Sequence, residues 1–369
     1  MSTNRRLRAR TRLRSDEGKA YEVESLLGQG GFGTTYSGFR LASSGRRTRR
    51  VCIKVCRNRH DWHGEAFFGR LLASNPRVVR LEDAFVCPAG RGANQHHRHI
   101  LVFEYMHEGT VWDAVEDGMG PWSEAKVRRE VKALLNVLVD LHYAGVTHRD
   151  LKPDNVYLRD GRLVLGDFGI TRMSLDPSHS FISTFAPGFA PSNVRKNFRW
   201  AEADDVFQVG LLAATLLSGE VWSADTVAVQ WIAELPASDE FKSWIWHATG
   251  ALSKRYWHAG EAIHALDSLR RISLKPGRPP RSLANHRVVF TGRIDGLSRP
   301  QAVSLARSAG AVPQAEVTDR TSLVVVGRLK AGTVGKSEGL KLFATRERLR
   351  LGQDIRIVDS AQFKRLVGA

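Results

Sequence analysis

The stretch THRDLKPDNVYL, residues 147–158, constrains the fold more than any other part of the chain. It places Asp150, Lys152 and Asn155 close together between apolar flanks. Such charges are costly to bury unless partners neutralise them. A second acidic position, Asp167, follows in VLGDFG. Carboxylate and amide oxygens are ligands that suit Mg²⁺, and a lysine suits an anion, so the set predicts a site for a polyphosphate with magnesium.

A glycine-rich segment, LLGQGGFGTTYSG, predicts where the phosphates lie. Its spacing is Gly28-x-Gly30-x-x-Gly33, and glycines let backbone N–H groups approach phosphate oxygens closely. A dinucleotide-binding turn is the alternative, but it requires a helix to begin inside the motif. Here a strand-like TTY and then VCIK, with Lys54, follow. A glycine hairpin over a nucleotide, with Lys54 reaching the phosphates from the next strand, fits better.

The residue pattern predicts two lobes with a cleft between them. From residue 21 to about 103, short β-branched and aromatic runs alternate with loops, interrupted by one helix at about 62–73. From 111 to about 269 the period is helical, as in KVRREVKALLNVLVDLHYAG, which ends on a glycine. ISLKPGRPPRSLANH, residues 272–286, has three prolines and no acid, which indicates a linker. Alternating strands and helices then predict a small parallel α/β sheet.

The net charge of +17 lies almost wholly outside the central body. Residues 1–20 carry +5, residues 21–269 carry −1, residues 270–282 carry +5 and residues 283–369 carry +8. Flanking segments of this charge predict contact with a polyanion such as DNA, and arms that only maintain solubility are the alternative. Arginine outnumbers lysine 42 to 13, which is typical of a GC-rich bacterial genome.

The remaining composition favours a reduced, cytoplasmic protein. The three cysteines have no paired spacing, and no apolar run reaches the length of a membrane span. No apolar segment follows the charged N-terminus, so we expect no signal peptide. A bacterial cytosolic protein, nucleoid-associated if it binds DNA, is the expectation. The histidines at 96, 97 and 99 favour a solvated loop over a metal site.

The glycine loop, Lys54, HRDLKPDN and GDFG occur in an order that resembles the eukaryotic-type protein kinase family over residues 21–269. The resemblance implies a two-lobed α+β fold, ATP and Mg²⁺ as cofactors, and transfer of the γ-phosphate to Ser/Thr hydroxyls of a protein substrate. The DLKPDN wording resembles the serine/threonine branch. Phe103 resembles the family's gatekeeper beside a hinge of Glu104 to Met106, and Asp205 its helix aspartate that braces the catalytic loop.

The site residues expected from the motifs and this resemblance fall into four groups. They are the catalytic residues Asp150, Lys152, Lys54 and Glu65; the ATP-binding residues Gly28, Gly30, Gly31, Gly33, Lys54, Glu104 and Met106; the metal ligands Asn155 and Asp167; and, for activation, Arg149 with the phosphosites Ser183 and Thr184. Ser174, Ser178 and Ser180 are further candidate phosphosites.

Two positions depart from the family's pattern. Its A-P-E is Ala190-Pro191-Ser192 here, so we expect Arg255 to lack its usual carboxylate partner and the activation segment to be less ordered. Glu65 is the only glutamate between Lys54 and Glu82, and its short spacing from Lys54 implies a trimmed loop. A solvated helix face is the alternative for Glu65.

Residues 283–369 resemble a BRCT domain through RVVFTG, a helix opened by Ser-Arg, SLVVVG and a late Phe363. A generic α/β module is the alternative. The resemblance implies a phosphate pocket of Thr291, Gly292, Arg299 and Lys336, and a parallel four-stranded sheet. Its partner would be a DNA backbone or 5′-phosphate end, a phosphoprotein, or another docked protein. Pro276-Gly277-Arg278-Pro279 favours a stiff spacer over a minor-groove hook, since no arginine precedes the glycine.

The sequence therefore predicts a basic arm at 1–20, a kinase domain at 21–271 with lobes at 21–103 and 107–271, a basic linker at 272–282 and a BRCT-like domain at 283–369. Its expected function is serine/threonine phosphorylation, targeted to DNA or a phosphorylated partner. A pseudokinase scaffold with a protein-docking module is the alternative.

Overall fold

The computed structural model describes residues 6–90, 95–169, 172–173, 180–181, 186–269, 272–328 and 337–369. The chain divides into two compact units. Unit 1 comprises residues 1–226 and 247–266, and unit 2 comprises residues 227–246 and 267–369.

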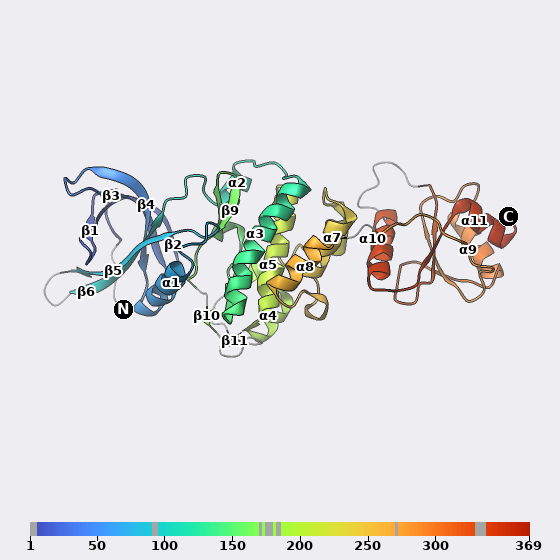
Figure 1. Cartoon of the computed structure of the whole chain (residues 1–369). Coiled ribbons are helices and arrows are strands. Elements are labelled where there is room, and N and C mark those ends of the chain that lie inside the picture. Colours follow the sequence, from blue (N-terminus) through green and yellow to red (C-terminus); the bar gives the residue numbers. More distant parts are fainter. Residues whose placement is uncertain are drawn as a thin grey trace. The chain divides into compact units, whose positions relative to one another are not determined.

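An antiparallel sheet of six strands forms the first part of unit 1, in the order β1-β2-β3-β4-β6-β5 (Figure 1). The strands are β1 Arg12–Arg14, β2 Ala20–Gly30, β3 Gly33–Leu41, β4 Arg47–Cys56, β5 Leu81–Ala89 and β6 His96–Glu104. Alternate residues such as Val51, Ile53 and Val55 enter one apolar core, as the period of a half-buried strand requires. Helix α1, Arg59–Leu71, contacts β4, β5 and β6 and begins at Asn58, whose side chain accepts the N–H of Asp61.

The described part of the basic arm, residues 6–20, is attached to the six-stranded sheet. β1 pairs with β2, with Leu13 opposite Tyr21. Leu7 and Leu13 are buried in the same core as Val51, and the Leu7 N–H donates to the Tyr36 hydroxyl. The leucines between the arginines therefore attach the arm to the sheet. These leucines could have indicated the attachment in the sequence, but the high charge of the segment drew attention away from them.

Helices dominate the rest of unit 1. They are α2 Val111–Glu116, α3 Glu124–Tyr143, α4 Ser192–Asn197, α5 Glu202–Ser218 and α8 Ala259–Asp267, with short 3₁₀ turns at Pro153–Asn155, Pro187–Phe189 and Leu252–Lys254. Helix α7, Asp239–Thr249, belongs to unit 2 except for its last three residues. α3 and α5 pack together, and most of α5 is buried (Figure 1). α3 ends before Gly145, at φ +69°, which matches the predicted glycine stop.

Short two-stranded sheets form within the segments that connect these helices. β8 Val156–Arg159 pairs with β9 Arg162–Leu165, β7 Val146–Thr147 with β10 Arg172–Met173, and β11 Ser180–Phe181 with β12 Arg199–Trp200. Of the segments that the structure describes, no helix is both long and apolar enough to cross a membrane.

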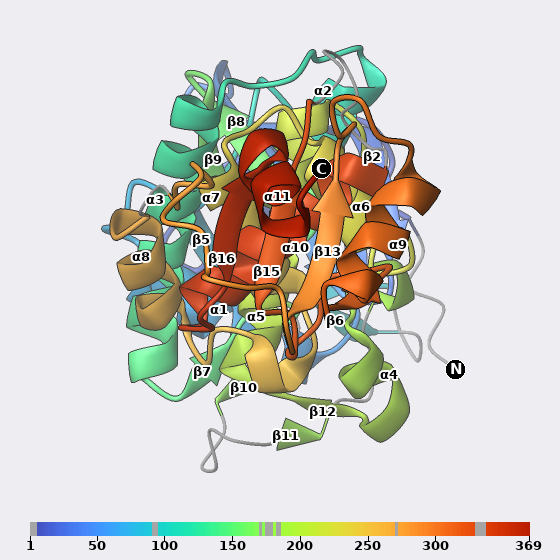
Figure 2. The same ribbon diagram turned by 90° about the vertical axis from the view of Figure 1, so that its right-hand side faces the viewer.

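Unit 2 contains a four-stranded sheet that is parallel throughout, in the order β14-β13-β15-β16. The strands are β13 Arg287–Thr291, β14 Val312–Gln314, β15 Leu323–Val326 and β16 Arg356–Asp359, and the helices are α9 Arg299–Ser308, α10 Ser337–Arg350 and α11 Ser360–Val367. This confirms the predicted parallel four-stranded sheet. Figure 2 shows β13, β15 and β16 side by side, with α9 and α11 beside them.

The two faces of this sheet have separate cores. Val288 and Phe290 pack with Ala302 of α9 and Phe363 of α11, whereas Val289 packs with Ile357 on the other face. Strands buried on both faces are typical of parallel sheets. Leu274 of the expected linker packs on the second face, and the Gly277 N–H donates to the Ile357 carbonyl, so this part of the linker lies on the sheet.

Residues 227–246 group with unit 2 because α6, Val229–Glu234, contacts α10, and Asp239 forms an ion pair with Arg346. This grouping cuts across the boundary expected at 271, which the sequence placed at the linker.

Candidate active site

The glycine segment forms the turn of the hairpin between β2 and β3. Gly30 pairs with Gly33, and the strand pairing continues through Gly28 and Thr35. A Cβ at Gly33 would lie 2.3 Å from the Val55 carbonyl oxygen, so this position requires glycine. At Gly28, Gly30 and Gly31 a Cβ would meet open space. The hairpin agrees with the preferred interpretation of this motif and contradicts the dinucleotide-binding turn, which needs a helix here.

Lys54 lies between two carboxylates. Its Nζ is 2.8 Å from the Glu65 carboxylate on α1 and 2.9 Å from the Asp167 carboxylate, and Lys54 and Glu65 are both buried. Burial raises the pKa of Glu65 to about 7. Burial opposes the charged form of Lys54, but Asp167 and Glu65 raise its pKa well above the ordinary value. The structure thus brings Glu65 to Lys54 and excludes the solvated helix face.

A cavity of about 530 Å³ opens beside this cluster. The glycine hairpin, the strand end at Phe103 and the GDFG segment all contribute to its walls. The predicted site residues that line it are Gly28, Lys54, Glu65, Glu104, Met106 and Asp167. The Glu104 carboxylate accepts hydrogen bonds from Arg159 and from the Arg80 N–H, each at 2.6 Å, which fixes the strand end that leads into Met106.

The segment HRDLKPDN brings its polar side chains together. The Asn155 amide nitrogen donates to the Asp150 carboxylate at 2.7 Å and to the Asp150 carbonyl at 2.8 Å. Lys152 Nζ lies 3.4 Å from the Asp150 carboxylate. Burial raises the pKa of Asp150 above its ordinary value. Because a raised pKa brings a carboxylate nearer to neutral pH, Asp150 is suited to accept a proton.

Asp205 fixes the backbone of this segment by accepting hydrogen bonds from it. It accepts the N–H groups of His148 and Arg149 at 2.8 and 2.9 Å and is itself fully buried. Burial opposes ionisation, but the hydrogen bond with His142 lowers the pKa of Asp205. Sequence reasoning had placed Asp205 here but missed Gln208, one helical turn further on, which accepts the Leu151 N–H.

The residues expected to control activation are only partly described. Arg149 is buried at φ +72°, and its Nε donates to the Thr147 hydroxyl at 2.9 Å. Ser183 and Thr184 lie outside the described residues, as do Ser174 and Ser178.

Arg255 has a carboxylate partner other than the A-P-E glutamate that the chain lacks. Arg255 Nη1 donates to the Asp204 carboxylate at 2.7 Å, and both side chains are almost fully buried, at 2% and 1% exposure. Asp204 also accepts the Asn193 amide at 3.0 Å. Burial raises the pKa of Asp204, and the Arg255 charge counteracts this effect. A carboxylate from α5 is therefore the partner of Arg255, and Asn193, beside Ser192, joins the same network.

In unit 2, three of the four expected phosphate-pocket residues are described. The Thr291 side chain at the end of β13 is fully buried. Gly292 has φ +70°, and a Cβ there would lie 2.8 Å from the Gly327 carbonyl oxygen. Arg299 donates to the Gly292 carbonyl at 2.8 Å and lies over the Phe290 ring. Lys336 lies outside the described residues.

The polar side chains in and next to the cavity fit a magnesium nucleotide. Asp167 lines the cavity, whereas Asn155 does not line it but accepts, through its backbone carbonyl, the N–H of the lining residue Gly166. Because the Asn155 amide nitrogen is used by Asp150, its amide oxygen is left as an acceptor, and Asp167 supplies a carboxylate. Burial opposes ionisation of Asp167, but Lys54 lowers its pKa. No group of three or more His, Cys, Asp or Glu side chains suited to a metal occurs among the described residues. Two protein ligands suit a Mg²⁺ that takes its others from phosphates and water.

Comparisons with known proteins agree with this geometry. The protein kinase domain family matches residues 21–253, which is more than half of the chain and none of residues 283–369. Relatives include a calcium-dependent protein kinase SK5 from Glycine max, 31% identical over 54% of this chain and 39% of its own, and serine/threonine-protein kinase B from Synechocystis, 27% identical over 67% of this chain and 46% of its own. Serine/threonine-protein kinase PknL from Mycobacterium tuberculosis is 31% identical over 54% of this chain and 49% of its own. The chain thus spans less than half the length of these curated relatives.

Proposed function

The chain belongs to the protein kinase family, and on this basis we propose that it is a serine/threonine protein kinase that transfers the γ-phosphate of ATP to protein hydroxyls. The observation that carries the proposal is the bonded set of Lys54, Glu65 and Asp167 in the wall of one cavity. The DLKPDN wording and the printed names of the bacterial relatives support the serine/threonine branch.

Each buried charge has a role in this proposal. Magnesium-bound ATP, when present, supplies the phosphoryl group and a cation that offsets its charge. Glu65 holds the Lys54 ammonium, which would contact the nucleotide phosphates, and Asp167 with the Asn155 amide oxygen would hold the metal. Asp150 accepts the proton of the attacking hydroxyl, and the nearby Lys152 ammonium offsets negative charge on the transferred group.

The boundaries of the kinase domain are also proposed. The kinase domain would extend over 21–271, including the residues that group with unit 2, because the family match runs without a break to 253. Arg149 would bind a phosphorylated Ser183 or Thr184 during activation.

Labelled ATP tests the proposal through Asp150. Asp150→Asn keeps the size of the side chain but cannot accept the proton, so transfer to a serine-containing protein should fall by about 10²- to 10⁴-fold. The matched control is Asp160→Asn, a loop residue in the turn between β8 and β9, whose rate should stay within about twofold of the natural chain.

The alternative, a pseudokinase scaffold, predicts a different result in the same assay. The natural chain would then shift its thermal unfolding with Mg-ATP and yet give no labelled product. The Asp204–Arg255 pair weakens this alternative. The missing A-P-E glutamate suggested that Arg255 has no carboxylate partner, but Asp204 is such a partner.

We also propose that residues 283–369 form a BRCT-like domain that brings the kinase to DNA. The protein would then be cytoplasmic and associated with the nucleoid of a bacterial cell. A net charge of +8, the parallel sheet and the placement of Arg299 beside Gly292 support this. A phosphoprotein is the other partner that such a phosphate pocket would fit.

Duplexes with and without a 5′-phosphate test the second proposal. The full chain should prefer the phosphorylated end, and Arg299→Gln with Lys336→Gln should abolish that preference, because both side chains would contact the phosphate. Arg320→Gln, an exposed arginine of the same unit, is the control and should keep it. Equal binding of both duplexes by the natural chain would refute end recognition, and tighter binding of a phosphopeptide would favour the other partner.

A further inference from the structure

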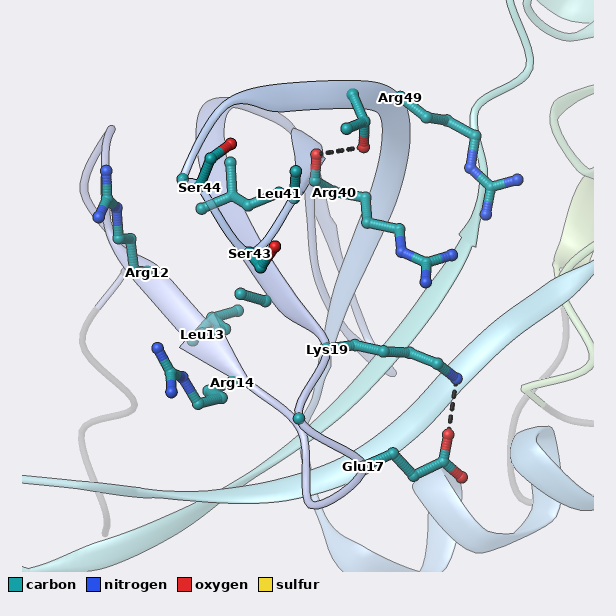
Figure 3. Close-up of a pocket in the computed structure, with 15 residues that line it drawn as sticks. Arg12, Leu13, Arg14, Glu17, Lys19, Arg40, Leu41, Ser43, Ser44 and Arg49 are labelled. Atoms are coloured by element: carbon teal, nitrogen blue, oxygen red, sulfur yellow. Dashed lines mark hydrogen bonds and ion pairs between the residues drawn. The ribbon is translucent and has the colours of Figure 1, made fainter.

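A second cavity, of about 930 Å³, lies at the far end of the N-terminal sheet from the glycine hairpin turn (Figure 3). It is lined by β1, by the turn from β1 to β2, and by the ends of β3 and β4 with the loop between them. None of the residues proposed for catalysis or ATP binding lines it. Leu13 and Leu41, both buried in the sheet core, contribute its apolar part.

The lining is strongly basic. It contains five cations, Arg12, Arg14, Lys19, Arg40 and Arg49, and a single acid, Glu17. Glu17 is already bound to Lys19 at 2.7 Å. Arg12 pairs with Glu22 at 3.3 Å, and Arg49 pairs with Glu82. Within the described part of the chain, Arg14 and Arg40 have no ion-pair partner, so the cavity has cations to offer to an anion.

The cations lie in two groups. Figure 3 shows Arg12 and Arg14 on one side of the cavity, and Arg40, Arg49 and Lys19 on the other. Ser43 and Ser44 of the loop between β3 and β4 also line the cavity. A ligand that contacts both groups needs at least two anionic positions some distance apart, as a repeating phosphate backbone has. Arginine, lysine and serine side chains are the usual partners of such phosphates.

The residues that line the cavity also restrict the kind of nucleic acid. None of the lining residues is aromatic. Proteins that bind single strands present aromatic rings on which the bases stack, so this cavity lacks their main recognition element. A duplex exposes its phosphates and keeps its bases stacked inside, and needs no such ring.

We propose that this cavity, formed by the ordered arginine-rich segment and the β3–β4 loop, binds the phosphate backbone of duplex DNA. It is a site on the kinase unit itself, separate from the phosphate pocket proposed in residues 283–369. Binding here is independent of a 5′-phosphate and of DNA sequence. Its affinity falls as the salt concentration rises, because binding releases counterions from the DNA phosphates.

Fluorescence anisotropy with the full-length chain tests the site. The probe is a labelled duplex of about 20 base pairs with 5′-hydroxyl ends, titrated at several salt concentrations. Arg14→Ala with Arg40→Ala should weaken binding about tenfold at ~0.1 M salt and reduce the slope of log K against log salt by about 2. Arg14→Lys with Arg40→Lys keeps the charges and should retain most of the binding.

The control double variant is Arg70→Ala with Arg162→Ala, two exposed arginines outside the cavity that remove the same charge. It should bind within about twofold of the natural chain. Equal losses in the two double variants would overturn the proposal, because net charge alone would then explain binding. Stronger binding of single-stranded DNA, duplex RNA or a polyglutamate of equal charge would overturn it as well. The Arg14→Ala, Arg40→Ala variant should still prefer a duplex with a 5′-phosphate, which would show that this site acts independently of the phosphate pocket proposed in residues 283–369.

Discussion

At the scale of single residues, the site depends on buried and half-buried charges whose partners decide their protonation. Lys54, Asp167 and Glu65 form one cluster, and Asp205 organises the loop that carries Asp150. The motifs predicted Lys54, Asp150 and Asp167 because a lysine and carboxylates have evident uses at a magnesium-bound polyphosphate, whereas Glu65 and Asp205 were expected only from the resemblance to the kinase family. The motifs could not predict Gln208, since an amide on an apolar helix has no pattern that links it to a loop 57 residues earlier in the chain.

His148 provides a pH-dependent test at this scale. Its side chain is fully buried, and burial lowers its pKa below the ordinary value of 6.5, against the opposing charges of Asp205, Asp150 and Asp167. The folded state therefore holds it neutral, whereas the unfolded chain protonates it near pH 6.5. This contribution to stability is complete above pH 6.5 and is lost as the pH falls below that value.

Denaturant unfolding between about pH 7.5 and pH 5 measures this loss, which reaches about 1.4 kcal/mol per pH unit for one proton. His148→Phe should reduce the slope, because the phenyl ring does not titrate. His97→Asn, with an exposed side chain, should leave it unchanged. An identical slope in His148→Phe and the natural chain would show that other groups cause the acid sensitivity.

At the scale of elements, the Asp204–Arg255 pair joins α5 to the turn that ends at Arg255, and Asn193 brings α4 into the same network. Strands, helices and the glycine hairpin were predicted well because their periodicity is local. The substitute partner of Arg255 was not, because Asp204 and Arg255 are 51 residues apart and only the folded chain brings them together.

Asp204→Asn tests this network. The variant leaves Arg255 buried without its counter-charge, so the free energy of unfolding should fall by about 3 kcal/mol. Ser192→Ala, at the exposed position where the family has its glutamate, should change it by less than about 0.5 kcal/mol. Urea unfolding measures both, and an unchanged midpoint in Asp204→Asn would mean that the pair contributes nothing to stability.

At the scale of the whole molecule, the strand-then-helix pattern predicted a β-rich part followed by an α-rich part, and the later alternation of strands and helices predicted the parallel direction of the second sheet. The attachment of residues 6–14 was not predicted, because two leucines among five arginines give no clear period, and their partners come from strands of the folded sheet. Likewise, residues 272–277 have the composition of a linker, yet Leu274 packs on a sheet that forms from distant segments. Positive charge predicted a polyanion for the molecule as a whole, but only the fold shows which cations line one cavity.

The central claim is that the cavity beside Lys54 holds magnesium-bound ATP for transfer. The most direct measurement is the single-turnover rate of γ-phosphate transfer as a function of Mg²⁺ concentration, in the natural chain and in Asp167→Asn. We predict Mg²⁺-dependent transfer by the natural chain, and a rate at least about 10²-fold lower in the variant, since one metal ligand is lost. No transfer by the natural chain at saturating Mg-ATP, or equal rates for both proteins, would contradict the claim.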